Sequence, residues 1–166
     1  MKVVLAGLTA VLIISGCSRT TAFTHFTKLD SMQERAVSTL QTASIFDGIH
    51  RKAIMSTIYL NHVDPNIYKL QETFLMALYL RDNKTLKLPN LDETQAMYQL
   101  TLNGIAPLEI RIVEKDDPLR RLMPINNDWN YFYTVEFAQS KEDNLTLTLE
   151  NDQFDSVSLT YQKDDL

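Results

Sequence analysis

Apolar and polar residues alternate with a period of two through much of the chain after residue 50. Leu145, Leu147 and Leu149, for example, point one way, and the intervening threonines point the other. Such alternation is typical of β-strands that bury one face and expose the other. The pattern predicts seven strands, at Lys52–Asn61, Glu72–Asp82, Gln95–Leu102, Leu108–Val113, Tyr131–Phe137, Leu145–Leu149 and Ser156–Tyr161.

A longer period, of three to four residues, precedes the strands. The apolar residues at this spacing are Leu29, Met32, Ala36, Val37, Leu40 and Ala43. They predict an amphipathic helix over residues 28–46, ended by Asp47-Gly48, which we expect to cover the core. A helix that docks a partner or lies on a membrane is the alternative. The polar face of the predicted helix carries Gln33, Glu34, Ser38 and Gln41, which are uncharged or acidic, whereas a membrane-surface helix typically carries many Lys and Arg there.

Two turns suggest antiparallel pairs of strands. Asn103-Gly104 supplies the residues of a tight hairpin turn, so the predicted strands 95–102 and 108–113 are expected to pair, although Pro107 delays the start of pairing. The last two predicted strands are expected to pair in the same way, around a turn at Asn151–Asp155.

The segment Asp64–Asp82 fits either a helix or a strand. Asp64-Pro65 is a good helix start, and apolar residues recur at helical spacing beyond it. Phe74–Leu80, however, is apolar on both faces, as expected of a central strand covered by a second sheet on one side and by the N-terminal helix on the other. We therefore predict a helical turn through Gln71 and a strand from Glu72.

These elements predict one globular domain over residues 28–166, with its β-rich part at 51–162. The fold class is mainly β: an antiparallel β-sandwich of immunoglobulin-like size, preceded by one amphipathic helix. A small β-barrel and an α+β fold are the alternatives. The Cys-Trp-Cys signature of true immunoglobulin domains is absent, since the chain holds a single Cys.

The N-terminal residues have the pattern of a secretory signal peptide. Lys2 precedes an apolar run, Val3–Ile14, and small residues follow it directly. The four residues Ile14-Ser15-Gly16-Cys17 resemble the lipobox of bacterial lipoproteins. The resemblance implies that residues 1–16 are a cleaved signal peptide, that Cys17 is lipidated with palmitate among its acyl chains, and that residues 17–27 form a tether. In that family Ser18 after the Cys goes with the outer membrane more often than with the inner one.

Composition narrows the function classes. With 16 Lys and Arg against 21 Asp and Glu, the net charge is -5, which disfavours nucleic acid as a partner. Three His and one Cys offer little material for a metal site or a disulfide, and no Gly-x-Ser-x-Gly elbow is present. We therefore expect no catalytic residues, no metal and no cofactor.

The longest irregular stretch, Glu114–Asn130, is the best candidate for a binding site. Long loops in compact domains are often functional, and Arg beside exposed apolar and aromatic residues has the composition of a binding hot spot. The candidate partner-binding residues are Arg120, Arg121, Leu122, Met123 and Trp129. The alternative is that the apolar members only pin a strand crossover to the sandwich.

The sequence thus predicts a non-catalytic lipoprotein of the cell envelope. Its tethered sandwich would bind a protein partner or serve as an accessory subunit of an envelope assembly. The alternative is a periplasmic carrier or chaperone for a lipid or another apolar ligand. A carrier would need the aromatic strand face of Tyr131, Tyr133 and Phe137 to line a cavity.

Overall fold

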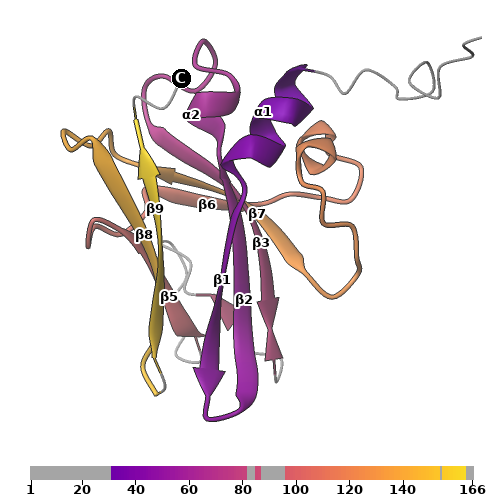
Figure 1. The fold of residues 1–166 in the computed structure, drawn as a ribbon, viewed down its shortest axis with the longest axis vertical. Helices are drawn as coiled ribbons and strands as arrows, with labels where there is room; N and C mark the ends of the chain where they lie inside the picture. Colours follow the sequence, from indigo (N-terminus) through magenta and orange to yellow (C-terminus); the bar gives the residue numbers. More distant parts are fainter. Residues whose placement is uncertain (1–30, 82–84, 87–95, 154, 164–166) are drawn as a thin grey trace, which may run out of the picture.

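The computed structural model describes residues 31–81, 85–86, 96–153 and 155–163, which form two β-sheets with short helices beside them (Figure 1). The five-stranded sheet has the order β1 (Gln41–Asp47), β2 (His50–Tyr59), β3 (Glu72–Leu80), β7 (Tyr131–Phe137) and β6 (Glu109–Ile112). The four-stranded sheet has the order β4 (Thr85–Leu86), β5 (Ala96–Leu102), β8 (Asn144–Asn151) and β9 (Ser156–Gln162). Neighbouring strands are antiparallel except β4 and β5. The predicted mainly β, sandwich-like fold is confirmed.

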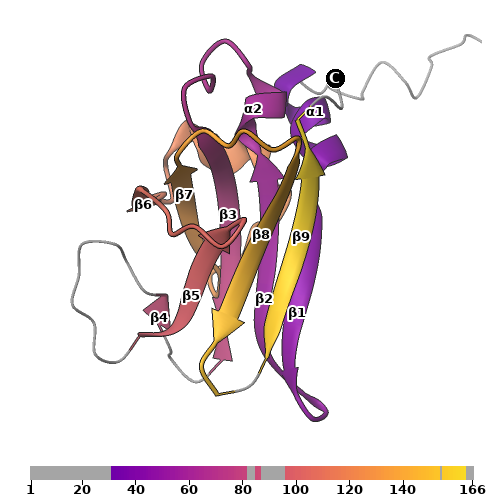
Figure 2. The ribbon, with the colours of Figure 1, turned by 90° about the vertical axis from the view of Figure 1, so that its left-hand side faces the viewer.

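The two sheets meet along one edge. Strands β1 and β9, each at the edge of its own sheet, lie side by side (Figure 2). The side-chain amide of Gln41 in β1 donates a hydrogen bond of 2.8 Å to the carbonyl of Thr160 in β9. At the opposite side, β6 and β4 end their sheets apart from each other. Among the described strands, the sandwich is therefore closed along the β1–β9 edge and not at the opposite side.

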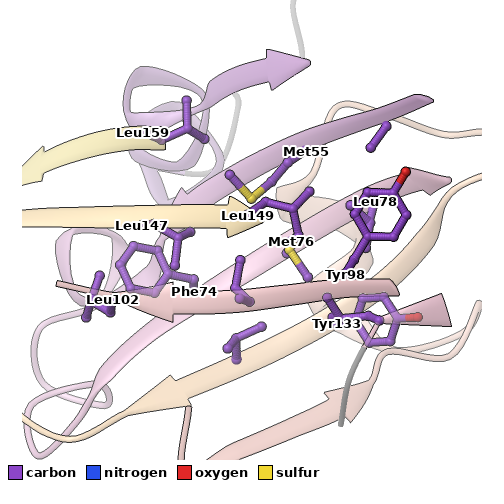
Figure 3. Close-up of a cluster of buried hydrophobic side chains, with 14 of the residues drawn as sticks. Met55, Phe74, Met76, Leu78, Tyr98, Leu102, Tyr133, Leu147, Leu149 and Leu159 are labelled. Carbon is purple, nitrogen blue, oxygen red and sulfur yellow. The ribbon is translucent and has the colours of Figure 1, made fainter. Parts of the chain in front are cut away.

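The main core fills the space between the sheets (Figure 3). Phe74 and Met76 of β3 point into it from one sheet, and Tyr98 of β5 and Leu147 of β8 point into it from the other. These side chains are at most 2% exposed, so the burial of apolar surface between the sheets supplies much of the stability. Many of the apolar residues whose alternation predicted the strands face this core.

A second core lies on the outer face of the five-stranded sheet. It is covered by helix α1 (Ser31–Thr39), helix α2 (Leu60–Val63) and the 3-10 helix η3 (Pro118–Leu122). Leu75 and Ala77 of β3 belong to this core together with Ala36 of α1, whereas their neighbours along the strand belong to the main core. The prediction that this strand begins at Glu72 is confirmed, and its outer face is covered as far as Ala77; the strand ends at Leu80 rather than at Asp82.

The predicted N-terminal helix was too long. Of residues 28–46, the structure describes 31–46, and the helix ends at Thr39. Residues Gln41–Asp47 instead form β1, paired with β2. Asp47-Gly48 is therefore a hairpin turn rather than a helix end, and Gly48 has the positive φ of 58° that such a turn requires. The apolar residues around positions 40–46 fit both a helical and a strand spacing, and pairing with β2 makes the segment a strand.

The pairing predicted around Asn103-Gly104 was also wrong. Both residues have positive φ, and residues 102 and 105 are joined by two hydrogen bonds, so the tight turn itself is present. Beyond it the chain crosses over: β5 pairs with β8 in one sheet, and β6 pairs with β7 in the other. Pro107, which has no amide hydrogen to donate, stands where a longer ladder would continue. The predicted pairing of β8 with β9 is confirmed.

Candidate binding groove

An open groove of about 720 Å³ lies on the outer face of the five-stranded sheet. The helices cover one end of this face, and the groove occupies the other end, over the first half of β2 and the last half of β3. Its most prominent lining residues are Arg51, Ile54, Tyr79, Arg81, Ile125 and Trp129. The groove thus places two cations beside two large aromatic side chains.

A β-bulge brings Arg51 into the groove. Ile45 of β1 pairs with Ala53, but the next residue, Phe46, pairs with Arg51, so Lys52 is skipped in the register. Without the bulge, strict alternation from Ile54 would place Lys52 on this face. A bulge re-aims neighbouring side chains in this way. The Arg51 guanidinium lies 5.4 Å from the centre of the Phe46 ring.

The displaced Lys52 has a different role. Its ammonium lies 3.7 Å from the carboxylate of Asp47, at the end of β1. The bulge therefore directs two neighbouring cations to different places. Lys52 points toward Asp47 of the same hairpin, and Arg51 points toward the groove. The guanidinium of Arg51 offers several fixed donors that can bind a carboxylate in two places at once, which an ammonium cannot do.

Strand β3 supplies Tyr79 and Arg81. Residues 75 and 77 belong to the second core, so the next outward positions of the same strand are 79 and 81. Tyr79 is half-buried in the groove floor and pairs with Ile54 across the strands. Arg81 follows directly after the strand ends. Simple alternation along β3 therefore lines up an aromatic ring and a cation.

Trp129 stands on the loop that forms the wall of the groove. It is 70% exposed, which is unusual for so large an apolar side chain. The loop is fixed close to it: the side chain of Asn127 accepts a hydrogen bond of 3.0 Å from the Asn130 amide, and Ile125 packs against the second core. An exposed ring on an anchored loop is preorganised for contact, since little freedom is lost on binding.

The five residues predicted from the sequence lie in three different environments. Trp129 lines the groove, whereas Leu122 and Met123 are buried in the second core. The Arg120 guanidinium lies over the Phe132 ring, 3.2 Å from its centre, and Arg121 is exposed. The structure therefore brings only Trp129 of this set into the groove. Sequence reasoning missed Arg51 and Arg81, whose placement depends on pairing between strands.

A buried polar cluster lies elsewhere, at the end of the sandwich near α2. Glu72 is 2% exposed, and its carboxylate accepts hydrogen bonds from the Tyr59 hydroxyl at 2.5 Å and from the Ser140 amide at 2.9 Å. Lys163 pairs with the same carboxylate at 2.6 Å. A ring nitrogen of His62 lies 3.1 Å from the Lys163 carbonyl.

The surroundings of this cluster favour a structural role. Burial, and then the adjacent Glu72 carboxylate, raise the pKa of the Tyr59 phenol far above its ordinary value. Burial also raises the pKa of Tyr161, whose hydroxyl bonds to Thr57. The carboxylate of Glu72 is satisfied by three donors inside the protein, so it joins strands and loops rather than facing a ligand.

Within the described part of the chain, no three His, Cys, Asp or Glu side chains gather closely enough to hold a metal ion. No helix in those residues has the length and apolar character needed to cross a membrane. Cys17 and Ser18 lie outside the described residues.

The chain was also compared with known proteins as a whole. No protein-family model, no curated protein and no solved structure matches it.

Proposed function

We propose that this protein is a non-catalytic lipoprotein of the bacterial cell envelope whose sandwich domain binds a protein partner. The lipobox-like residues 14–17 support the lipid anchor, and Ser18 supports the outer membrane as its site. With a lipid on Cys17, the domain would be held at a membrane surface.

The observation that carries the binding role is the exposed Trp129 at the wall of a groove that also holds Arg51, Tyr79 and Arg81. Trp, Tyr and Arg are the residue types that contribute most to protein–protein binding energy, and they do so when clustered. Here the three types meet on one face of an otherwise acidic chain. A protein partner explains this gathering better than chance exposure does.

The chemistry of the groove supports binding rather than catalysis. Among the described residues that line it there is no His, Asp or Glu to accept a proton. The hydroxyls of Thr42 and Ser56 are hydrogen-bonded to each other at 2.8 Å, which keeps both within the sheet surface. A nucleophile beside a general base, which most hydrolases need, is therefore not provided by the described lining.

The packing of β7 favours a protein partner over an apolar cargo. Tyr133, Val135 and Phe137 are buried in the main core, where Phe137 contacts Phe74 with ring centres 6.0 Å apart. The aromatic face that a carrier would use to line a cavity is thus occupied by contacts between the sheets. The carrier remains the second candidate, and a bound lipid in the purified protein would favour it.

A photo-cross-linking amino acid tests the proposal at residue level. Placed at Trp129 in cells, it should give one discrete protein adduct in the native membrane. The matched control is the same amino acid at Ser158, an exposed position in β9 of the other sheet. Absence of an adduct at position 129, or the same adducts at both positions, would contradict the proposal.

A further inference from the structure

We propose that the groove recognises an acidic segment of a polypeptide that also carries a large apolar side chain. In this arrangement the carboxylates of the segment bind Arg51 and Arg81, and its apolar side chain packs against Trp129 and Tyr79. The inference rests on the proposed function and specifies what the partner presents to the groove.

The charges of the groove oppose those of the whole chain. The chain has a net charge of -5, yet the two fully charged side chains among the described residues that line the groove are both Arg. Negative charges on a partner are therefore attracted by the groove and repelled by much of the remaining, acidic surface. This arrangement gives a partner a preferred place and orientation.

The type of cation points to carboxylates held with defined geometry. The bulge at Lys52 turns the flexible ammonium toward Asp47 and leaves a planar guanidinium in the groove. Guanidinium groups bind carboxylates through two parallel hydrogen bonds, and such pairs are stronger and more directional than those of ammonium groups. Arg81 adds a second guanidinium to the groove lining, and its several donors can bind a second acidic residue of the same segment beside the contact it already makes within the protein.

The apolar part of the groove requires an apolar partner. Trp129 is 70% exposed, and Ile54 and Tyr79 lie half-buried in the floor. Covering such a surface with a Leu or Phe side chain removes apolar area from water, which favours binding. A segment with acidic groups alone would leave this surface wet.

Other anionic partners fit the groove less well. Nucleic acids and anionic membranes bind through many clustered cations on a positively charged surface. The described lining of the groove holds two cations, in a chain whose acidic residues outnumber its basic ones by 21 to 16. Two separate carboxylates on a polypeptide match two arginines, whereas a dense polyanion would be repelled by the rest of the surface.

The chain contains one Trp, so its fluorescence reports directly on the groove. The full-length protein in detergent is titrated with three capped hexapeptides: acidic and apolar (Glu-Leu-Glu-Phe-Glu-Leu), basic and apolar (Lys-Leu-Lys-Phe-Lys-Leu), and acidic and polar (Glu-Ser-Glu-Ser-Glu-Ser). The first should shift the Trp129 emission to shorter wavelength in a saturable way. The other two should bind at least about tenfold more weakly, because the basic peptide has no carboxylates for the arginines and the polar peptide has no apolar side chain for Trp129.

Charge reversal provides the decisive variant. Arg51→Glu with Arg81→Glu should lose the acidic peptide and gain the basic one. The matched control, Lys69→Glu with Lys141→Glu, changes two exposed cations outside the groove by the same charge and should stay within about twofold of the unchanged protein. If the reversed variant fails to fold, Arg51→Lys with Arg81→Lys keeps the charge and should weaken binding several-fold.

Three outcomes would overturn the inference. They are equal binding of the acidic and basic apolar peptides, equal binding of the acidic polar peptide, and an emission shift with phosphatidylglycerol vesicles but with no peptide. A discrete cross-link at position 129 that the charge-reversed variant retains would leave the proposed function standing and refute only the acidic segment. Loss of both the cross-link and the peptide response would refute both.

Discussion

The carboxylate of Glu72 lies 2.6 Å from the ammonium of Lys163, and the pair joins the start of β3 to the residue after β9. The carboxylate is almost fully buried, and the ammonium also donates to the carbonyl of Ser140 at 2.5 Å. The ion pair thus connects the two sheets at the end of the sandwich opposite the β1–β2 turn.

Removing the cation of this pair should destabilise the fold strongly. Lys163→Met leaves the Glu72 carboxylate buried without its charge partner, and we expect a loss of about 3–5 kcal/mol in the free energy of unfolding, measured with urea. The double variant Lys163→Met with Glu72→Gln should recover part of the lost free energy of unfolding, because no buried charge then lacks a partner. As a control, Lys141→Met, at an exposed site, should change stability by less than about 0.5 kcal/mol. A small effect of Lys163→Met would show that water reaches Glu72.

Alkaline pH should destabilise the protein through Tyr59 and Tyr161. The pKa values of both phenols are raised in the folded state, chiefly by burial, whereas tyrosines of the unfolded chain lose their protons near pH 10. Above that pH the unfolded state therefore holds fewer protons than the folded state, and stability falls as pH rises. Urea midpoints between pH 8 and 11 should fall less steeply in Tyr161→Phe than in the exposed-site control Tyr131→Phe. Parallel curves would contradict the assignment.

The two adjacent arginines of η3 should behave differently. Arg120 lies over the Phe132 ring, so Arg120→Ala should cost about 1 kcal/mol of stability through the lost cation–π contact. Arg121 is exposed, and Arg121→Ala should change stability by less than about 0.5 kcal/mol. Equal losses in the thermal midpoints of the two variants would show that the ring contact contributes nothing. Cross-linking yields at position 129 in Arg121→Glu would show whether this residue also contacts the partner.

The proposed lipid anchor on Cys17 predicts where in the cell the protein is found. Cys17→Ser removes the only thiol of the chain, so it should release the protein into the soluble periplasmic fraction or leave the precursor uncut. Membrane fractionation with immunodetection distinguishes these outcomes from the unchanged protein. A correctly cut variant that stays fully with the membrane would refute the anchor.

The sandwich could be predicted because its core obeys a local rule. Along β8, every second residue from Leu145 to Leu149 points inward, and that alternation is visible without knowing any partner strand. The segment 41–46 was misassigned because Leu40 and Ala43 also fit a helical period. Only pairing with β2 determines that it is a strand.

The groove could be predicted only in part. Trp129 was identified because its loop composition is visible in the sequence, but Arg51 enters the groove through a bulge that exists only relative to β1. The pair Glu72 and Lys163 was missed for a similar reason, since 91 positions separate two residues with no shared motif. Long-range register, rather than local propensity, decided each of these cases.

The closed edge of the sandwich has a consequence for how the chain folds. Gln41 and Thr160, which meet there, are 119 positions apart in the sequence. Bringing such distant segments together carries a large loop entropy, so this contact should form late and slow the overall folding reaction. Until the last strand has been synthesised, β8 keeps one side unpaired and open to intermolecular pairing. A ribosome-bound chain that stops short of β9 should therefore be prone to aggregation through this edge of β8.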